Sequence, residues 1–217
     1  IVIAAARDFG ARGLGIEYNA EMVAHAQRLA QAAGVADRAK FEKADIFESD
    51  FSKATVITMY LLPTLNMRLR PTLMKLRPGT KLVTHAFNMG GWQPDEISRA
   101  DGSTAHLWLV PANVTGKWKL HHPQGGRRLT VPMEVTRQRF QFPEGTVDLS
   151  GVENSLRDAR VIGDRLRFAL TGTDGVVRSF NGRVNGARIE GEVHDGHHSE
   201  RFSAERESEG PAIDVTD

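Results

Sequence analysis

The sequence has no cysteine among its 217 residues, which excludes disulfides, thiolate catalysis and cysteine-based zinc sites. It also has no apolar run that approaches the ~18–20 residues of a membrane-spanning helix. An excess of one charge is missing too, because 28 basic and 27 acidic side chains give a formal net charge of +1. Binding to duplex nucleic acid relies on several phosphate-neutralising cations. The composition therefore gives no indication of a nucleic-acid partner.

The sequence also does not begin with methionine. Residues 1–6 read IVIAAA, which is typical of the middle of a helix. We therefore expect a segment before Ile1, and a signal peptide or anchor in that segment would not be visible here. The lack of cysteine leaves the redox compartment open, and we expect a cytoplasmic protein. The length suits one large domain or two small ones.

Helical and strand patterns alternate along the first 110 residues. The patterns predict helices over residues 1–9, 20–33 and 65–76, and strands over residues 13–17, 39–44, 55–59 and 81–85. Asn19 is a suitable N-cap for the second helix, and Gly10 is a suitable end for the first. Leu107–Val110 can extend the same sheet. Strands that alternate with helices predict βαβ units and a parallel α/β sheet.

Glu17 closes the short strand Gly13-Leu-Gly-Ile-Glu17 and is followed at once by a helical pattern. A carboxylate at the carboxyl end of a parallel strand lies over the crevice where α/β sheets bind ligands. Its two oxygens can accept from two ribose hydroxyls. Glu17 is therefore a candidate ribose-binding residue, although a strand-end Glu can also simply pair with a cation or a helix dipole.

Several stretches in order carry a family resemblance. These are Gly13–Glu17, Asp45-Ile46, Tyr60-Leu-Leu-Pro63 and Leu-Arg77-Pro-Gly79-Thr-Lys-Leu-Val83. In this order the first half resembles a class I, seven-strand S-adenosylmethionine-dependent methyltransferase. Residues 57–87 are similar to the Dot1-like and related lysine methyltransferases. The resemblance implies a doubly wound, Rossmann-like sheet, with S-adenosyl-L-methionine as the cofactor.

The resemblance also implies roles for individual residues. Glu17 would bind the ribose hydroxyls, Tyr18 would flank the adenine, Asp45 would accept from the adenine amino group, and Ile46 would pack on the ring. Tyr60 would begin the loop between methyl donor and acceptor, where this sequence has Thr58-Met59-Tyr60 in place of the family's Asn or Asp. The family's glycine-rich loop and central strand would lie before Ile1.

Other interpretations of these residues remain open. Asp45 alone is also typical of a turn, and Tyr60 could be a half-buried aromatic residue. His85, at the end of the fourth strand, is a candidate proton acceptor because its ordinary pKa lies near neutrality. It could equally bind a loop carbonyl. The catalytic candidates are thus Tyr60 and His85.

The second half changes to a pattern of period two, with apolar residues such as Leu129, Val131 and Met133 on one parity. Arg139–Phe142 and Val147–Leu149 read as further strand segments, and turn dipeptides occur at Gly163-Asp164, Asp174-Gly175 and Asn185-Gly186. We expect an antiparallel β domain, a small barrel or sandwich, over residues 111–206. The cofactor-binding domain would then cover residues 1–110, and residues 207–217 would form a disordered tail.

Two further patterns invite a functional interpretation. Residues 160–166 and 183–189 share the pattern R-V-x-G-x-R-[LI], which fits either two hairpins with the same turn chemistry or an arginine-lined mouth for an anionic substrate. His121-His122 and His194–His198 suggest metal binding. They fall in expected loops with nothing to aim them together, so we expect no metal site.

Three functions remain in consideration. The first is methyl transfer to a protein lysine or a small-molecule amine, with the β domain shaping the acceptor site. The second is S-adenosylmethionine binding without transfer. The third is another nucleotide-dependent enzyme such as a dehydrogenase, because a strand-end Glu also suits a dinucleotide ribose. The order of Asp45-Ile46 and Tyr60–Pro63 favours the first over the third.

Overall fold

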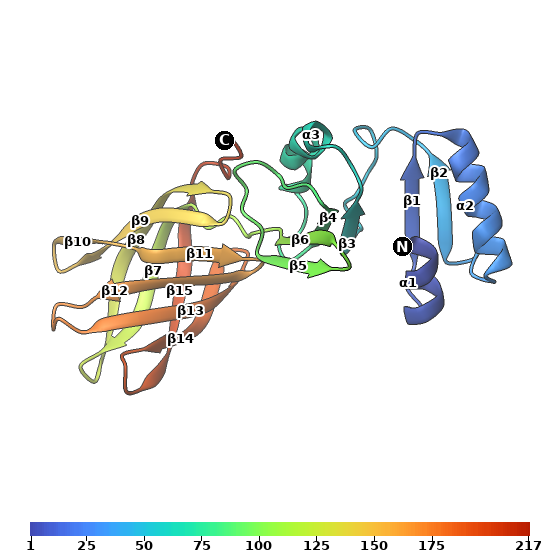
Figure 1. Cartoon of the computed structure of the whole chain (residues 1–217). Coiled ribbons are helices and arrows are strands. Elements are labelled where there is room, and N and C mark those ends of the chain that lie inside the picture. Colours follow the sequence, from blue (N-terminus) through green and yellow to red (C-terminus); the bar gives the residue numbers. More distant parts are fainter. The chain divides into compact units, whose positions relative to one another are not determined.

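The computed structural model describes all residues 1–217, which divide into two compact units, residues 1–51 and 52–217 (Figure 1). This boundary lies inside the stretch of residues 1–110 that the sequence assigns to one cofactor-binding domain. The second unit contains both the rest of that stretch and the β-rich half of the chain.

In the first unit, two helices pack on a pair of parallel strands. Helix α1 (Val2–Phe9) leads into β1 (Gly13–Glu17), and α2 (Ala20–Ala32) leads into β2 (Ala39–Lys43). The two strands pair from Gly13 opposite Ala39 to Glu17 opposite Lys43. Their carboxyl ends therefore meet at one edge, as the sequence predicts.

The local sequence explains how these elements end and pack. Gly10 terminates α1 in the left-handed conformation with φ 66°, and the Asn19 side chain accepts from the backbone N–H groups of Glu21 and Met22 at the start of α2. The core consists of small residues, because the helices approach the strands closely: Ala6, Ala30, Val35 and Ala39. A Cβ at Gly15 would lie 2.4 Å from the Phe41 ring, so this strand position requires glycine.

The second unit begins with a four-stranded sheet in the order β3-β4-β6-β5. Its elements are β3 (Val56–Met59), α3 (Pro63–Leu73), β4 (Lys81–His85), β5 (Glu96–Ala100) and β6 (Ser103–Leu109). Strands β3 and β4 are parallel, while β6 pairs antiparallel with β4 and β5. The expected extension of the sheet by Leu107–Val110 is thus confirmed within β6. The preceding strand β5 has all five side chains exposed and shows no apolar pattern that would predict it.

The β-rich half forms one nine-stranded antiparallel sheet in the order β10-β9-β8-β7-β15-β14-β13-β12-β11. Its strands are β7 (Gly116–Gln124), β8 (Arg127–Arg139), β9 (Phe142–Leu149), β10 (Val152–Ser155), β11 (Arg157–Ile162), β12 (Arg165–Thr171), β13 (Val177–Asn185), β14 (Arg188–His194) and β15 (Ser199–Glu209). The Val161 N–H donates to the Gln141 carbonyl across the open side, next to β9. The sheet is therefore a nearly closed barrel, as Figure 1 shows.

Apolar side chains at alternate positions along the strands fill the interior of the barrel. In β13, for example, Arg178, Phe180, Gly182 and Val184 point inward and their neighbours point outward. The interior is rich in aromatic residues, with Phe168 and Phe180 stacked at 4.6 Å between ring centroids. Burial of this many apolar side chains is the dominant favourable contribution to folding. The expected hairpin turns are confirmed at Gly163, Gly175 and Gly186, which all have positive φ.

Three sequence-based expectations need correction. Arg139–Phe142 is a tight turn and not a strand, since Phe140 has φ 51° and links β8 to β9. His121 and His122 lie within strand β7 and not in a loop. The expected disordered tail is also wrong, because β15 continues to Glu209. Beyond it, the terminal residues make contacts that their polar composition does not reveal.

The terminal residues contact the rest of the second unit through ion pairs. Asp217 accepts from the Arg70 guanidinium of α3 at 2.7 Å, and Arg70 is buried against the Phe140 ring. Asp214 accepts from Arg137 of β8. A buried cation without its carboxylate is strongly unfavourable, so these contacts hold the last residues against α3 and the barrel. None of the three helices is long and apolar enough to cross a membrane.

Candidate functional site

Glu17 and Asp45 lie at the carboxyl edge of the β1–β2 pair. Glu17 is the last residue of β1, and its backbone carbonyl accepts from the N–H of Ala44, just after β2. One oxygen of each carboxylate is held by the backbone: Glu17 Oε1 accepts from the Asn19 N–H at 2.9 Å, and Asp45 Oδ1 accepts from the Phe47 N–H at 2.8 Å. The structure therefore brings these two predicted residues together.

The second oxygen of each carboxylate has no hydrogen-bond partner within the protein. Both side chains are exposed, so these oxygens can accept from a ligand. Tyr18 lies directly after Glu17 with 79% of its surface exposed, and Ile46 follows Asp45 as a half-buried apolar residue. This edge offers acceptors and apolar surface, and it fits a ligand that carries a diol, an amino group and a flat ring.

The turn at Asp45 also supports the more ordinary interpretation of that residue. Its Oδ1 contact with the Phe47 N–H is an Asx turn, and its backbone carbonyl accepts from the Ser49 hydroxyl at 2.6 Å. The turn fixes the direction of the carboxylate. A structural role and a binding role for Asp45 are thus compatible in this geometry.

Tyr60 and His85 lie side by side at the carboxyl edge of the β3–β4 pair in the second unit. Their ring centroids are 5.0 Å apart and the rings are tilted by 48°. Met59 is opposite Thr84 in the parallel register, so the next residue of each strand projects from the same edge. Tyr60 is 80% exposed. The expectation of a half-buried aromatic residue is therefore wrong, and the two catalytic candidates form one exposed pair.

The loop after His85 is held in a strained conformation. Ala86 has φ 63°, which a residue with a Cβ rarely adopts. The buried Thr84 hydroxyl donates to the Phe87 carbonyl, and the Phe87 N–H donates to the His85 carbonyl at 2.7 Å. Strain of this kind persists only where the surroundings enforce it, and it is concentrated at functional sites. These contacts hold His85 beside Tyr60.

His106, opposite Thr84 in the β4–β6 pair, is a further titratable group in this sheet. Burial, followed by the charge of Arg99, lowers the pKa of the His106 imidazole. Its ring lies 5.7 Å from that of Trp108. The imidazole is therefore neutral at physiological pH and adds no positive charge to the sheet that carries Tyr60 and His85.

Phe87 and the Thr84 hydroxyl also belong to this site and are not among the residues that the sequence predicts for it. Phe87 is 41% exposed in the loop that follows β4. The available signal was a large aromatic residue just beyond a predicted strand. Large aromatic residues are mostly buried, so one in a loop is unusual. The Thr84 contact is a tertiary feature, so no sequence pattern predicts it.

The histidines do not gather into a metal site. Nowhere in residues 1–217 do three His, Asp or Glu side chains form a group that could hold a metal ion. His121 and His122 point to opposite faces of β7, and the His121 ring nitrogen bonds to the Thr130 hydroxyl at 2.8 Å. The His194–His198 segment bends through Asp195, whose carboxylate accepts from two backbone N–H groups.

Comparisons with known proteins place this geometry in a family. A family model described as the ANTKMT methyltransferase domain matches residues 1–96. A protein-lysine N-methyltransferase from Saccharolobus islandicus (strain REY15A) is 42% identical over 116 residues, which are 51% of this chain and 72% of that protein.

A solved structure gives a similar result. The crystal structure of an RNA methyltransferase from Salinibacter ruber, in complex with S-adenosyl-L-homocysteine, matches with a TM-score of 0.51 and 49% sequence identity. The match covers 52% of this chain and 75% of that one. Both relatives thus cover about half of the chain, and the family model ends before the barrel begins.

Proposed function

The chain belongs to the ANTKMT methyltransferase family and is a class I S-adenosylmethionine-dependent methyltransferase, and from this premise we propose that its acceptor is the side chain of a protein lysine. The observation that carries the proposal is the exposed Tyr60–His85 pair at the carboxyl edge of β3 and β4. The similarity to a protein-lysine N-methyltransferase supports the same acceptor.

We assign the nucleoside part of the cofactor to the β1–β2 edge. The free oxygen of Glu17 would accept from the ribose hydroxyls and that of Asp45 from the adenine amino group, with Tyr18 and Ile46 packed on the adenine ring. Glu17 and Asp45 are already oriented by backbone N–H groups. Little side-chain freedom is therefore lost on binding. When bound, S-adenosylmethionine supplies an electrophilic methyl carbon.

Tyr60 and His85 would position the acceptor. The lysine nitrogen must lose its proton to attack, since an ammonium has no lone pair. His85 is held by the strained loop, and an imidazole can accept that proton as a general base. The face of the Tyr60 ring would attract the charged ammonium on arrival and pack along the lysine stem.

RNA is a second candidate acceptor, favoured by the similarity to a solved RNA methyltransferase. The near-neutral charge of this chain argues against it, because 28 cations are matched by 27 anions. We also propose that the alternating helices and strands of residues 1–110 are parts of a doubly wound, Rossmann-like sheet for cofactor binding. Residues 111–206 then form a β domain that serves the acceptor.

The test is transfer of labelled methyl from S-adenosylmethionine by the full-length gene product. The acceptors are a lysine-containing polypeptide and an RNA oligonucleotide of similar length, each offered separately. We expect label on lysine after total hydrolysis. His85→Ala is expected to lower kcat/KM by roughly 100-fold, in the range of a lost general base. His197→Ala, an exposed histidine of the β14–β15 turn, serves as the matched control and should leave the rate unchanged.

Two results would overturn the proposal. Label on RNA with none on lysine would show that RNA, the second candidate, is the acceptor. Lysine methylation that is equally fast in His85→Ala and in the wild type would remove His85 from the reaction.

A further inference from the structure

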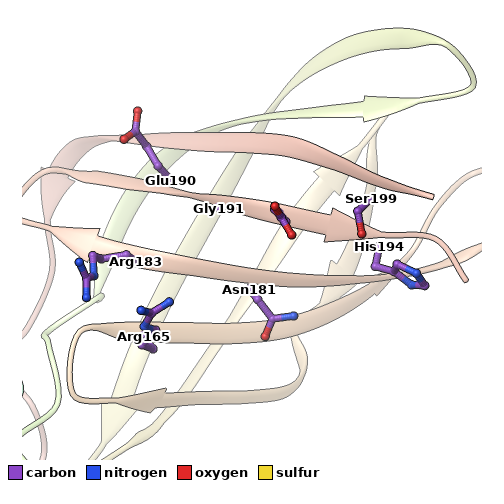
Figure 2. A pocket seen from close by; sticks show the side chains of 8 residues that line it. Arg165, Asn181, Arg183, Glu190, Gly191, His194 and Ser199 are labelled. Atoms are coloured by element: carbon purple, nitrogen blue, oxygen red, sulfur yellow. The ribbon is translucent and has the colours of Figure 1, made fainter. Parts of the chain in front are cut away.

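A hollow lies on the outer face of the barrel, away from the residues discussed so far. It has a volume of about 470 Å³ and is lined by side chains of β12, β13, β14 and β15. Figure 2 shows Arg165 and Arg183 on neighbouring strands, with His194 and Ser199 towards the other end of the hollow. A second, smaller hollow shares Arg165 and Asn181 with it, so the two adjoin. We call this feature the outer trough.

Paired glycines form the floor of the outer trough. Gly182 of β13 lies directly opposite Gly191 of β14. A Cβ at Gly191 would lie 2.0 Å from the Asn181 carbonyl oxygen and 2.5 Å from the Gly182 Cα. The strands are thus bent against each other more tightly than side chains allow. The two facing glycines allow β13 and β14 to approach closely beneath the outer trough.

Charges cross the outer trough in two parallel rows. In one row Arg167 lies opposite Asn181, which lies opposite Glu192. In the other row Arg165 lies opposite Arg183, which lies opposite Glu190. In each row the cation is on the β12 side and the anion is on the β14 side.

Several of these charges are not neutralised within the protein. Arg183 pairs with Asp164 at 2.9 Å, and Glu190 pairs with Arg188 at 2.8 Å. Arg167 and Glu192 make no ion pair, although Arg201 of β15 lies opposite Glu192. Arg165 has only a 4.0 Å contact with Asp164. Like charges directly opposite in a sheet, as at Arg165 and Arg183, are destabilising. Asp164 contacts both of these arginines, whereas Arg167 and Glu192 keep unpaired charges of opposite sign on the same exposed face, available to a partner of complementary charge.

We propose that the outer trough is a docking site for a mixed-charge segment of the acceptor protein, with acidic residues over β12 and basic residues over β14. The inference rests on the proposed function in taking the docked segment to belong to the acceptor. Adjacent strands are about 4.8 Å apart, so β12 and β14 are separated by about 10 Å. This distance corresponds to roughly three residues of an extended chain at about 3.3 Å each. The matching segment carries an acidic and a basic residue about three positions apart.

A continuous polyanion fits the outer trough less well. The phosphate backbone would meet Glu190 and Glu192 after leaving the arginines, and these carboxylates would repel it. The repeated R-V-x-G-x-R pattern places Arg165 and Arg183 next to each other as a mouth for an anion would require. The acidic residues Glu190 and Glu192 on β14 favour instead a segment with acidic residues at one end and basic residues at the other.

The test is peptide binding measured by fluorescence anisotropy with the full-length protein at low salt. The probe is a labelled peptide with two aspartates, two serines and two lysines in that order, and the control peptide has the same residues with alternating charges. We expect the segregated peptide to bind at least about fivefold more tightly than the alternating one. The double variant Arg165→Glu with Arg167→Glu should lose at least about tenfold in affinity. It should gain affinity for a peptide in which lysines replace the aspartates.

The matched control is Arg127→Glu with Arg128→Glu, which changes the net charge equally at exposed positions of β8 outside the trough. It should bind the segregated peptide as the wild type does. If the double arginine variant fails to fold, Glu192→Lys tests the acidic side of the trough. This variant should weaken binding of the same segregated peptide. Equal binding by wild type and trough variants, or no binding by the wild type at millimolar peptide, overturns the proposal. So does tighter binding of an RNA oligonucleotide that the double variant abolishes.

This experiment requires neither cofactor nor methyl transfer. A failure to bind the peptide therefore leaves lysine methylation intact. A failure to methylate lysine, with peptide binding retained, counts against the proposed function and leaves the docking site in place.

Discussion

His122 is a titratable residue inside the barrel, with 2% of its surface exposed. Its ring packs edge-on against Phe180, its Nδ1 lies 3.1 Å from the Pro123 carbonyl oxygen, and its Nε2 has no partner. Burial lowers the pKa of the His122 imidazole and outweighs the hydrogen bond with the Pro123 carbonyl, which raises it; the charge of Arg178 lowers the pKa further, and that of Asp174 raises it. The folded protein therefore holds His122 neutral.

We predict that stability falls as the pH drops below about 6.5, the ordinary pKa of histidine. Between that pH and the lower folded-state pKa, the unfolded chain binds a proton that the folded chain does not, so acid favours unfolding. One proton limits this slope to about 1.4 kcal/mol per pH unit. The test is urea unfolding of the wild type and His122→Leu from pH 5 to pH 8, at intervals of about half a pH unit. The free energy of unfolding of His122→Leu should depend less steeply on pH than that of the wild type.

His121→Leu is the control for this prediction. It lies on the same strand but points outward, so its removal should leave the pH dependence unchanged. Identical slopes for wild type and His122→Leu would show that His122 is not held neutral by the barrel.

At the scale of elements, the facing glycines of β13 and β14 determine the curvature of the barrel. A Cβ at Gly191 would overlap backbone atoms, which cannot rotate away as a flexible side chain can. We expect Gly191→Ala to lower the free energy of unfolding by about 3 kcal/mol, at the upper end for overpacking. Gly186→Ala is the control, because a Cβ there meets open space and only its φ of 58° is unfavourable.

Gly186→Ala should cost about 1 kcal/mol, the usual penalty for a left-handed non-glycine residue. Chemical denaturation of both variants gives the two values directly. If Gly191→Ala is no more destabilising than Gly186→Ala, then the close approach of β13 to β14 is not a constraint on the fold.

Local chemistry made many elements predictable from the sequence. Gly10 and Asn19 mark helix ends through their own conformational preferences, and Gly163, Gly175 and Gly186 mark hairpins in the same way. Strand β5 escaped prediction because its side chains are all exposed and its partner β6 supplies the pairing. The Phe140 turn escaped because it uses a left-handed phenylalanine where a glycine would be the usual signal.

Parts of the candidate site were also predictable, for a different reason. Glu17 and Asp45 follow parallel strands, and parallel strands place their carboxyl ends at one edge. The same rule brought Tyr60 and His85 together. The outer trough could only be suspected from its arginines. The position of its acidic residues on β14 depends on the register between β13 and β14, which no local sequence pattern predicts.

At the scale of the whole molecule, the family similarity and the barrel cover different stretches. The family model ends at residue 96, and the barrel begins at Gly116. Within the second unit the two stretches are joined by partly buried polar contacts. Asp95, in the segment before β5, accepts from Arg160 of β11 at 2.8 Å, and the Gln141 amide donates to the Gln93 carbonyl at 2.8 Å. The barrel is therefore firmly attached to the sheet that carries Tyr60 and His85.

These contacts give the barrel a role in the enzyme, although the catalytic candidates Tyr60 and His85 lie outside the barrel. Partly buried ion pairs and amide contacts resist separation, since breaking them leaves polar groups without their partners. A barrel fixed in this way can present the outer trough to an acceptor protein at a constant position relative to the Tyr60–His85 pair. This arrangement agrees with a protein acceptor, which offers more surface than a small amine.

The most direct test of the central claim is calorimetric binding of S-adenosylhomocysteine to the full-length gene product, with Glu17→Ala and Glu42→Ala beside it. Glu42 is an exposed glutamate of β2 outside the proposed cofactor edge, so its variant should bind as the wild type does. Glu17→Ala should weaken binding by about 10- to 100-fold, the equivalent of about 1.5–3 kcal/mol for hydrogen bonds to a charged group. Absence of binding by the wild type, or equal affinities for all three proteins, would contradict the account.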